Sequence, residues 1–124
     1  MKAFSFDLMD GIASERNGEV IIRKRIEFKQ LTASEVFAAQ DKAEEMKLTP
    51  NGYELLTSPA KLSRELVRLS VKKIDEDSGM GEAEMRKLSD RDWSLMMAKY
   101  EEFTALQNAL LEKRLKDSEQ VGKQ

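Results

Sequence analysis

The chain has 124 residues, a length that suits one domain of ordinary size. Its 21 basic and 23 acidic residues leave a net charge of -2, so no overall field draws it to nucleic acid or to an anionic membrane. Cysteine and histidine are both missing, which excludes disulfides, thiolate nucleophiles, the common zinc sites and imidazole catalysis. We therefore expect a protein that is no enzyme and holds no metal or cofactor.

The first residues and the hydropathy of the chain give an expectation about location. No stretch of ~18 apolar residues is present, and Asp7 interrupts the apolar run that a signal peptide needs. We therefore expect a protein of the cytoplasm that does not bind a membrane.

Residues 3–29 are predicted to form an antiparallel β-hairpin. Apolar residues take every second position from Phe4 to Leu8, and the β-branched run from Val20 to Phe28 alternates in the same way. A three-residue loop at residues 16–18, with Gly18 in the left-handed conformation, sets the register. The expected cross-strand pairs are Ile12 with Ile22, Asp10 with Lys24, Leu8 with Ile26, and Phe6 with Phe28.

Three helices are predicted after the hairpin, at about residues 33–47, 59–72 and 90–114. A capping box from Thr32 to Glu35 starts the first helix, and Pro50-Asn51-Gly52 follows its end. Ser58-Pro59 starts the second, and Ser89 caps the third, with acidic residues in its first turn. These elements predict one small α+β domain over residues 1–115, mostly helical, with a flexible tail at 116–124.

Several patterns that resemble chemical sites have simpler explanations. The acidic loop at residues 75–77 lacks the spacing of a calcium-binding hand, and Gly79-Met80-Gly81 lacks the rest of a phosphate-binding loop. Asp90 and Asp92 are explained as helix-start residues. Arg23, Lys24 and Arg25 lie on a predicted strand and leave one alternative open, a small DNA-associated regulator that uses a basic β-ribbon. The structural alternative is a solvated strand face, and we expect no nucleic-acid partner.

The long C-terminal helix carries the candidate binding residues. Large apolar side chains recur along it at spacings of three and four, and methionine suits surfaces that accept varied apolar partners. A hairpin and two shorter helices cover only part of so long a helix, so the segment from Phe103 to Leu115 should remain available to another chain. The candidate partner-binding residues are Trp93, Met96, Met97, Tyr100, Phe103, Leu106 and Leu110.

The order of these motifs resembles a known family. The chain resembles the tail assembly chaperones of Mu-like phages and prophages in the order of its elements. That order is a strand pair, a helix opened by residues 31–36, a leucine-rich second helix, and residues 88–93 followed by Met96 and Phe103. The similarity runs from about Val20 to Leu110. Residues 29–31 are Lys-Gln-Leu, where the family often has Arg-Glu-Pro.

The resemblance implies a non-enzymatic role in building a phage tail. Such chaperones coat the long, helical tape measure protein, keep it soluble and bring tail tube subunits to it. The expected partners are therefore the tape measure protein, the tail tube protein and further copies of the chain itself. The resemblance also implies action in the cytoplasm of the bacterial host and absence from the mature virion.

Overall fold

The computed structural model describes residues 3–122, and the side chains of residues 3–118. Two long strands, β1 (Phe4–Arg16) and β2 (Glu19–Phe28), form the antiparallel hairpin that the alternating residues predict. Phe6, Leu8 and Ile26 point into the core, as expected for the apolar face of a half-buried sheet. The predicted hairpin is confirmed.

The turn and the register of this hairpin differ from the prediction. Asn17 and Gly18 both have positive φ angles, 53° and 80°, so the strands are joined by a two-residue turn. Arg16 pairs with Glu19, Ile12 lies opposite Arg23, and none of the four predicted cross-strand pairs occurs. The three-residue loop was the wrong choice because Asn17, like Gly18, adopts the left-handed conformation.

A bulge in β1 shifts the register further along the hairpin. From Asp7 to Ile12 strand β1 advances by five residues while β2 advances by two, between Arg25 and Arg23. Gly11 lies in this bulge with φ at +79°, and a Cβ atom there would lie 2.8 Å from the carbonyl oxygen of Arg23. Only glycine fits this backbone without displacing β2.

The bulge is held by a buried carboxylate from the far end of the chain. The backbone N–H groups of Met9, Asp10 and Gly11 donate to the side chain of Asp92, over 2.7, 3.0 and 2.9 Å. The Asp92 side chain is fully buried, and these charge-assisted bonds compensate for its lost hydration. Beside it, the Asp10 carboxylate accepts hydrogen bonds from Arg91 and Ser89.

The second predicted helix ends early and is followed by a strand. Helix α2 (Pro59–Ser70) has the predicted Ser58 cap, but residues 71–74 form strand β5 (Val71–Ile74). β5 pairs with β2 and is followed by the short strand β6 (Asp77–Ser78), giving an antiparallel sheet in the order β1-β2-β5-β6. The free edge of β2 offers unpaired backbone groups, and pairing with them overrides the helical pattern of residues 71 and 72.

The first predicted helix also ends early. Helix α1 (Ala33–Lys42) starts at the predicted capping box, whereas the segment to residue 47 is not helical. Strands β3 (Glu44–Thr49) and β4 (Gly52–Thr57) form a separate two-stranded sheet between α1 and α2. The Pro50-Asn51 connection is therefore the turn of a second hairpin rather than a helix terminator.

The described residues contain four helices where the sequence predicts three. Helix α3 (Glu82–Arg86) is the additional one, and α4 (Asp90–Gly122) runs well beyond the predicted end at residue 114. Residues 116–122 of the predicted tail are helical, because no glycine or proline interrupts the chain before Gly122. The last two residues of that tail lie outside the described residues. The α+β class is confirmed.

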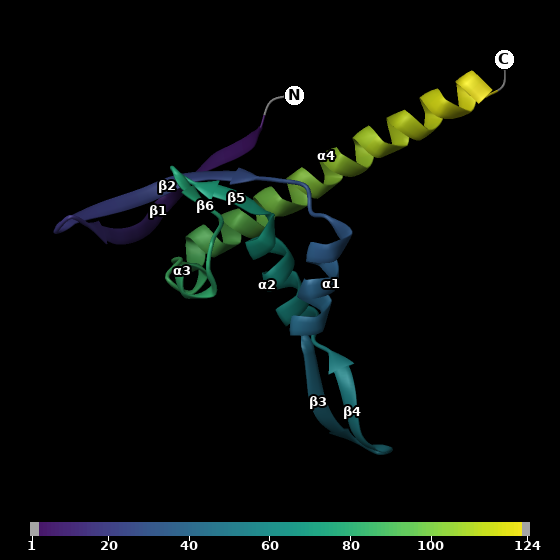
Figure 1. Ribbon diagram of the computed structural model, residues 1–124, viewed down its shortest axis with the longest axis horizontal. Helices are drawn as coiled ribbons and strands as arrows, with labels where there is room; N and C mark the ends of the chain where they lie inside the picture. Colours follow the sequence, from purple (N-terminus) through teal and green to yellow (C-terminus); the bar gives the residue numbers. More distant parts are fainter. Residues whose placement is uncertain (1–2, 123–124) are drawn as a thin grey trace.

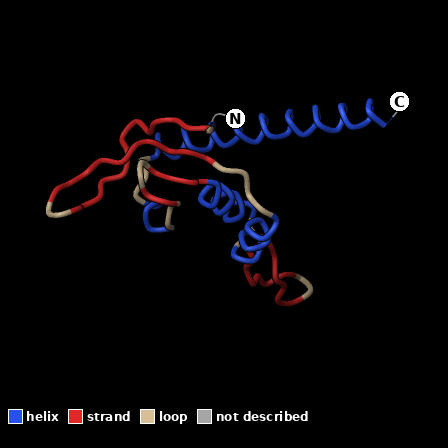
Figure 2. The backbone as a smooth tube through the Cα atoms, turned by 45° about the horizontal axis from the view of Figure 1, so that its top comes forward, coloured by secondary structure: helices blue, strands red, loops and turns tan. Residues whose placement is uncertain are grey.

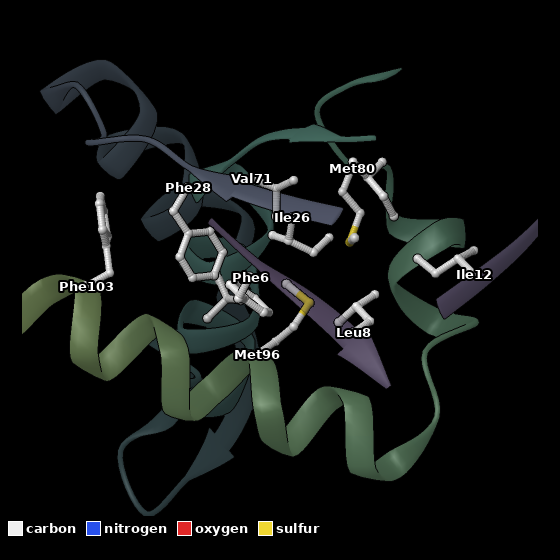
Figure 3. Close-up of a cluster of buried hydrophobic side chains, with 11 residues drawn as sticks. Phe6, Leu8, Ile12, Ile26, Phe28, Val71, Met80, Met96 and Phe103 are labelled. Atoms are coloured by element: carbon white, nitrogen blue, oxygen red, sulfur yellow. The ribbon is translucent and has the colours of Figure 1, made fainter. Parts of the chain in front are cut away.

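One hydrophobic core joins the sheet to the first half of α4. Figure 1 shows α4 passing along the four-stranded sheet and then continuing away from the rest of the molecule, while β3 and β4 project on another side. In Figure 3 the side chains of Phe6, Phe28, Met96 and Phe103 meet between the sheet and this helix. The core therefore joins the N-terminal strands and the first half of α4 to Val67, Val71, Ile74 and Met80 from the middle of the chain.

Replacing Asp92 by asparagine should lower the free energy of unfolding by about 2–4 kcal/mol. A neutral amide accepts weaker hydrogen bonds from the three bulge N–H groups, and its NH₂ group presents a donor where they need an acceptor. Urea unfolding followed by Trp93 fluorescence measures the loss. Asp90→Asn is the matched control, since exposed Asp90 contributes only a helix-dipole effect of about 0.5 kcal/mol. Equal losses in the two variants would contradict the assigned role of Asp92.

Gly11→Ala should destabilise the protein at least about twice as much as Gly18→Ala, a change that costs roughly 1 kcal/mol in a left-handed conformation. Both glycines have positive φ, but a Cβ at Gly18 meets no atom within 4 Å, whereas one at Gly11 meets β2. Thermal unfolding by circular dichroism compares the two variants. Indistinguishable midpoints would show that the bulge relaxes to admit a side chain.

The Asp10 and Arg91 pair should make stability depend on acid pH. The hydrogen bond from Arg91, with a second from Ser89, holds the pKa of Asp10 well below its usual value of 3.8. A lowered carboxyl pKa stabilises the fold above about pH 4, and this contribution is lost as the pH falls through the folded-state value. The unfolding midpoint of the protein is higher at about pH 5 than at about pH 2, and Arg91→Gln should therefore make this difference between the two midpoints smaller. An unchanged pH profile in that variant would exclude this pair as a source of acid sensitivity.

Candidate partner-binding surfaces

The first half of α4 belongs to the core of its own chain. Met96 and Phe103 are 0% and 6% exposed, and Trp93, Met97 and Tyr100 pack against the same cluster. The Phe28 ring lies 5.7 Å from that of Phe103 and makes an edge contact with Tyr100. Burial raises the pKa of the Tyr100 hydroxyl. Of the seven candidate residues, these five therefore hold the helix to the sheet. Met96 presents no free surface, and Phe103 keeps only a small exposed fraction.

The second half of α4 exposes leucines to solvent. Leu106, Leu111 and Leu115 are between 49% and 57% exposed, and Leu110 is half-buried. Figure 2 shows that this part of the helix has no other element beside it. We call Leu106, Leu110, Leu111 and Leu115 the distal leucines. Leu106 and Leu110 are thus the two candidate residues that lie outside the core cluster, and Leu111 and Leu115 extend the apolar surface along the helix.

A groove of about 250 Å³ lies where α4 leaves the body of the protein. Residues 29–31 between β2 and α1 form one side of it, with Val36 and Leu66 from the two helices. Phe103 and Gln107 of α4 form the other side. This groove adjoins the distal leucines on the helix, so it extends their apolar surface into a concave site.

The β3–β4 hairpin exposes a second apolar surface, which the sequence analysis missed. Met46, Leu48, Tyr53 and Leu55 are between 57% and 74% exposed, and we call them the apolar ribbon face. The alternation of apolar and polar residues on both sides of Pro50-Asn51-Gly52 was the signal for a hairpin. It was hidden because Met46 also falls at a helical spacing from Ala39 and Ala43.

A cleft of about 560 Å³ lies between α1, α2, α3 and the start of α4. Its lining consists of Lys42, Lys61, Arg64, Glu65, Glu82, Met85, Arg86, Leu88, Asp90 and Trp93. Lys42 forms an ion pair with Glu82, and the hydrogen bond from Arg68 lowers the pKa of Glu65 against the effect of burial. Four cationic and three acidic side chains nearly cancel, so the cleft favours no ligand of either charge.

The basic residues of β2 do not form a free cationic surface. Arg23 is buried and forms ion pairs with Asp77 at 2.8 Å and Glu84 at 2.6 Å. Burial acts to lower the pKa of Arg23, but the hydrogen bonds to Glu84 and Asp77 raise it overall. The expectation of a solvated Arg23 is therefore wrong. Lys24 and Arg25 are exposed, but Arg25 contacts Asp7 and Arg23 is already paired, so the basic β-ribbon offers fewer free cations to a nucleic acid than its sequence indicates.

Residues 3–122 carry neither a metal-binding cluster nor a membrane-spanning helix. No group of acidic side chains in this part of the chain is arranged to hold a metal ion. No helix of the same residues is long and apolar enough to span a bilayer.

Comparison with known proteins gives the family of the chain. A family model described as tail assembly protein gp41 matches residues 8–117, a range that includes the bulge in β1, the β3–β4 hairpin and the distal leucines of α4. No curated protein and no solved structure matches the chain. Because the match covers most of the 124 residues, the chain belongs to the tail assembly protein gp41 family of Mu-like phages.

Proposed function

We propose that this tail assembly protein is a chaperone that binds the tape measure protein, keeps it soluble and helps to recruit tail tube subunits. It works without catalysis in the cytoplasm of the bacterial host and is not part of the mature virion. The observation that supports this proposal best is the exposure of the distal leucines on a helix that extends beyond the protein's own core.

The distal leucines suit a long helical client. An amphipathic helix offers apolar side chains at spacings of three and four, and the distal leucines form two pairs with a spacing of four, Leu106 with Leu110 and Leu111 with Leu115. Glu112, Lys113 and Arg114 lie between these leucines and supply charges that keep the free protein and its complex in solution. Pairing of the two helices would remove both apolar faces from water.

The groove beside Phe103 gives this surface a concave end. At about 250 Å³ it has room for a large apolar side chain of a client helix that lies along α4. Side chains from α1, α2 and α4, together with the connection at residues 29–31, surround it, so packed helices position most of the site.

The energetics fit reversible binding. Complete burial of one leucine contributes about 1.5–3 kcal/mol, whereas association itself costs roughly 4–15 kcal/mol. Four partly exposed leucines therefore give only a modest net affinity for each chaperone. A client that must later be packed inside a tail tube requires such release, and several weak contacts along its length would still prevent aggregation.

Recruitment of tube subunits needs a surface that the client leaves open. The tip of the β1–β2 hairpin exposes Val20 and Ile22, and Figure 1 shows this tip on the opposite side of the molecule from the end of α4. Two partners could therefore be held at once. We assign the tail tube protein to this tip as part of the same proposal.

Leu111→Asp with Leu115→Asp should reduce the amount of soluble tape measure protein at least about tenfold when the two proteins are co-expressed, because two buried leucines are worth more than about 1.4 kcal/mol of affinity. Soluble and pelleted client are compared by quantitative gel analysis. The distal leucines lie outside the core, so the chaperone itself should keep its unfolding midpoint.

The matched control is Ala105→Asp with Ala109→Asp. These exposed residues lie on the opposite side of the same helix and receive the same charge change. The control should leave the client soluble. Full solubility with the leucine variant, or an equal loss with both variants, would refute the assignment of the client to the distal leucines. Phe103 is unsuitable for this test, since its replacement would open the core.

A further inference from the structure

The β3–β4 hairpin has two chemically different faces. Its register pairs Met46 with Leu55 and Leu48 with Tyr53, so the four residues of the apolar ribbon face lie together on one side. Lys47 and Glu54 lie opposite each other on the other side, where Glu45 forms ion pairs with Lys47 and Lys61 and Leu56 is the one large apolar residue. The hairpin is thus amphipathic, although no described element of the chain packs on its apolar face.

This hairpin is attached to the body only at its base. The backbone N–H of Ser58 donates to the carbonyl of Ala43 over 2.8 Å, and Lys61 reaches Glu45 over 2.6 Å. The two strands form their own sheet, and Figure 2 shows them projecting beyond α1 and α2. A two-stranded hairpin is marginally stable in water unless its apolar face packs on something. Its occupant should therefore be present whenever the chain is folded, rather than only during a transient encounter.

We propose that the apolar ribbon face binds the same face of a second copy of this chain, so that two hairpins pack face to face around a two-fold axis. The face offers on the order of 500 Å² of accessible side-chain surface, and two such faces together bury about 1,000 Å², the lower limit for a specific interface. A closed, symmetric pair needs only one kind of surface, which both copies carry.

The distribution of charge favours a second copy as the occupant. Glu44, opposite Thr57 at the base of the hairpin, is the one charged residue of β3 and β4 on the side of the apolar ribbon face. A two-fold packing that places the two hairpin bases at opposite ends keeps the two Glu44 side chains apart. Lys47, Glu54 and Glu45 point to the outer sides of the resulting two-layer structure and stay in water. A partner that binds through ion pairs would find its complementary charges on the wrong face.

This inference does not depend on the proposed function. It concerns a surface on β3 and β4, whereas the proposed client site lies on the second half of α4. A failure of either assignment leaves the other unchanged, because the variants that test them share no residue.

The first test measures the mass of the full chain in solution by light scattering during size-exclusion chromatography. We expect a dimer at about 100 µM, a concentration above the Kd of interfaces of this size. Leu48→Glu with Tyr53→Lys replaces an apolar cross-strand pair with an ion pair and leaves the net charge unchanged. This variant should dissociate at least about tenfold more readily, as two large side chains lose their buried contacts.

The matched control exchanges the charges on the outer face, Lys47→Glu with Glu54→Lys. It keeps opposite charges at the two paired positions and the net charge, although it removes the ion pair of Lys47 with Glu45, and it leaves the apolar ribbon face unchanged, so the dimer should persist. Unchanged Trp93 fluorescence in both variants shows that the body remains folded. A monomeric wild-type chain would overturn the proposal, as would a dimer that is broken by Leu111→Asp with Leu115→Asp and not by the hairpin variant.

A second test uses the absence of cysteine from the chain. Leu48→Cys introduces a single thiol on the apolar ribbon face, and Lys47→Cys introduces one on the outer face. Under mild oxidation Leu48→Cys should form disulfide-linked dimers at least about tenfold faster, since only thiols near a two-fold axis approach within reach of a disulfide. Equal cross-linking rates for the two variants would exclude face-to-face packing.

Discussion

The buried carboxylate of Asp92 determines how the two ends of the chain are joined. It accepts hydrogen bonds from three consecutive backbone N–H groups of β1 and lies in the first turn of α4, more than 80 residues away in sequence. Because a buried charge is tolerated only where such donors meet it, the bulge and the helix start must come together. The rotation of α4 about its axis is set at the same point, which turns Met96 and Phe103 toward the sheet. The distal leucines are therefore carried past the end of that sheet.

Local sequence signals predicted the starts of elements better than their ends. The capping box at Thr32 and the serine caps at Ser58 and Ser89 each act within one helical turn, and all three occur in the structure. The ends depend on distant partners. Helix α2 stops at Ser70 because the next residues pair with β2, and the hairpin register follows from the bulge that Asp92 holds. In the sequence Asp92 has the properties of an ordinary acidic residue of a first helical turn, so its long-range role could not be inferred.

The candidate site shows the same division between local pattern and global context. The apolar stripe of α4 is visible in the sequence, and the expectation that its second half outruns the body agrees with the exposure of Leu106. What the stripe does not reveal is the residue at which the core ends, since Phe103 and Leu106 are chemically alike and are separated by one turn. The apolar ribbon face was missed for a different reason, because Met46 satisfied both a helical and a strand period and the capping box favoured the helix.

The separation of the two exposed surfaces has a consequence for a chaperone with an extended client. A dimer joined through β3 and β4 would leave both copies of α4 outside the interface, because the hairpin and the end of α4 project on different sides of the body (Figure 1). Two helices on one particle bind a long helical partner with a higher effective concentration than either alone. Each contact could then remain weak enough to be released, while the pair stays on the client long enough to keep its apolar faces from aggregating. A single stronger site would stay on the client long enough only by losing the ability to release it.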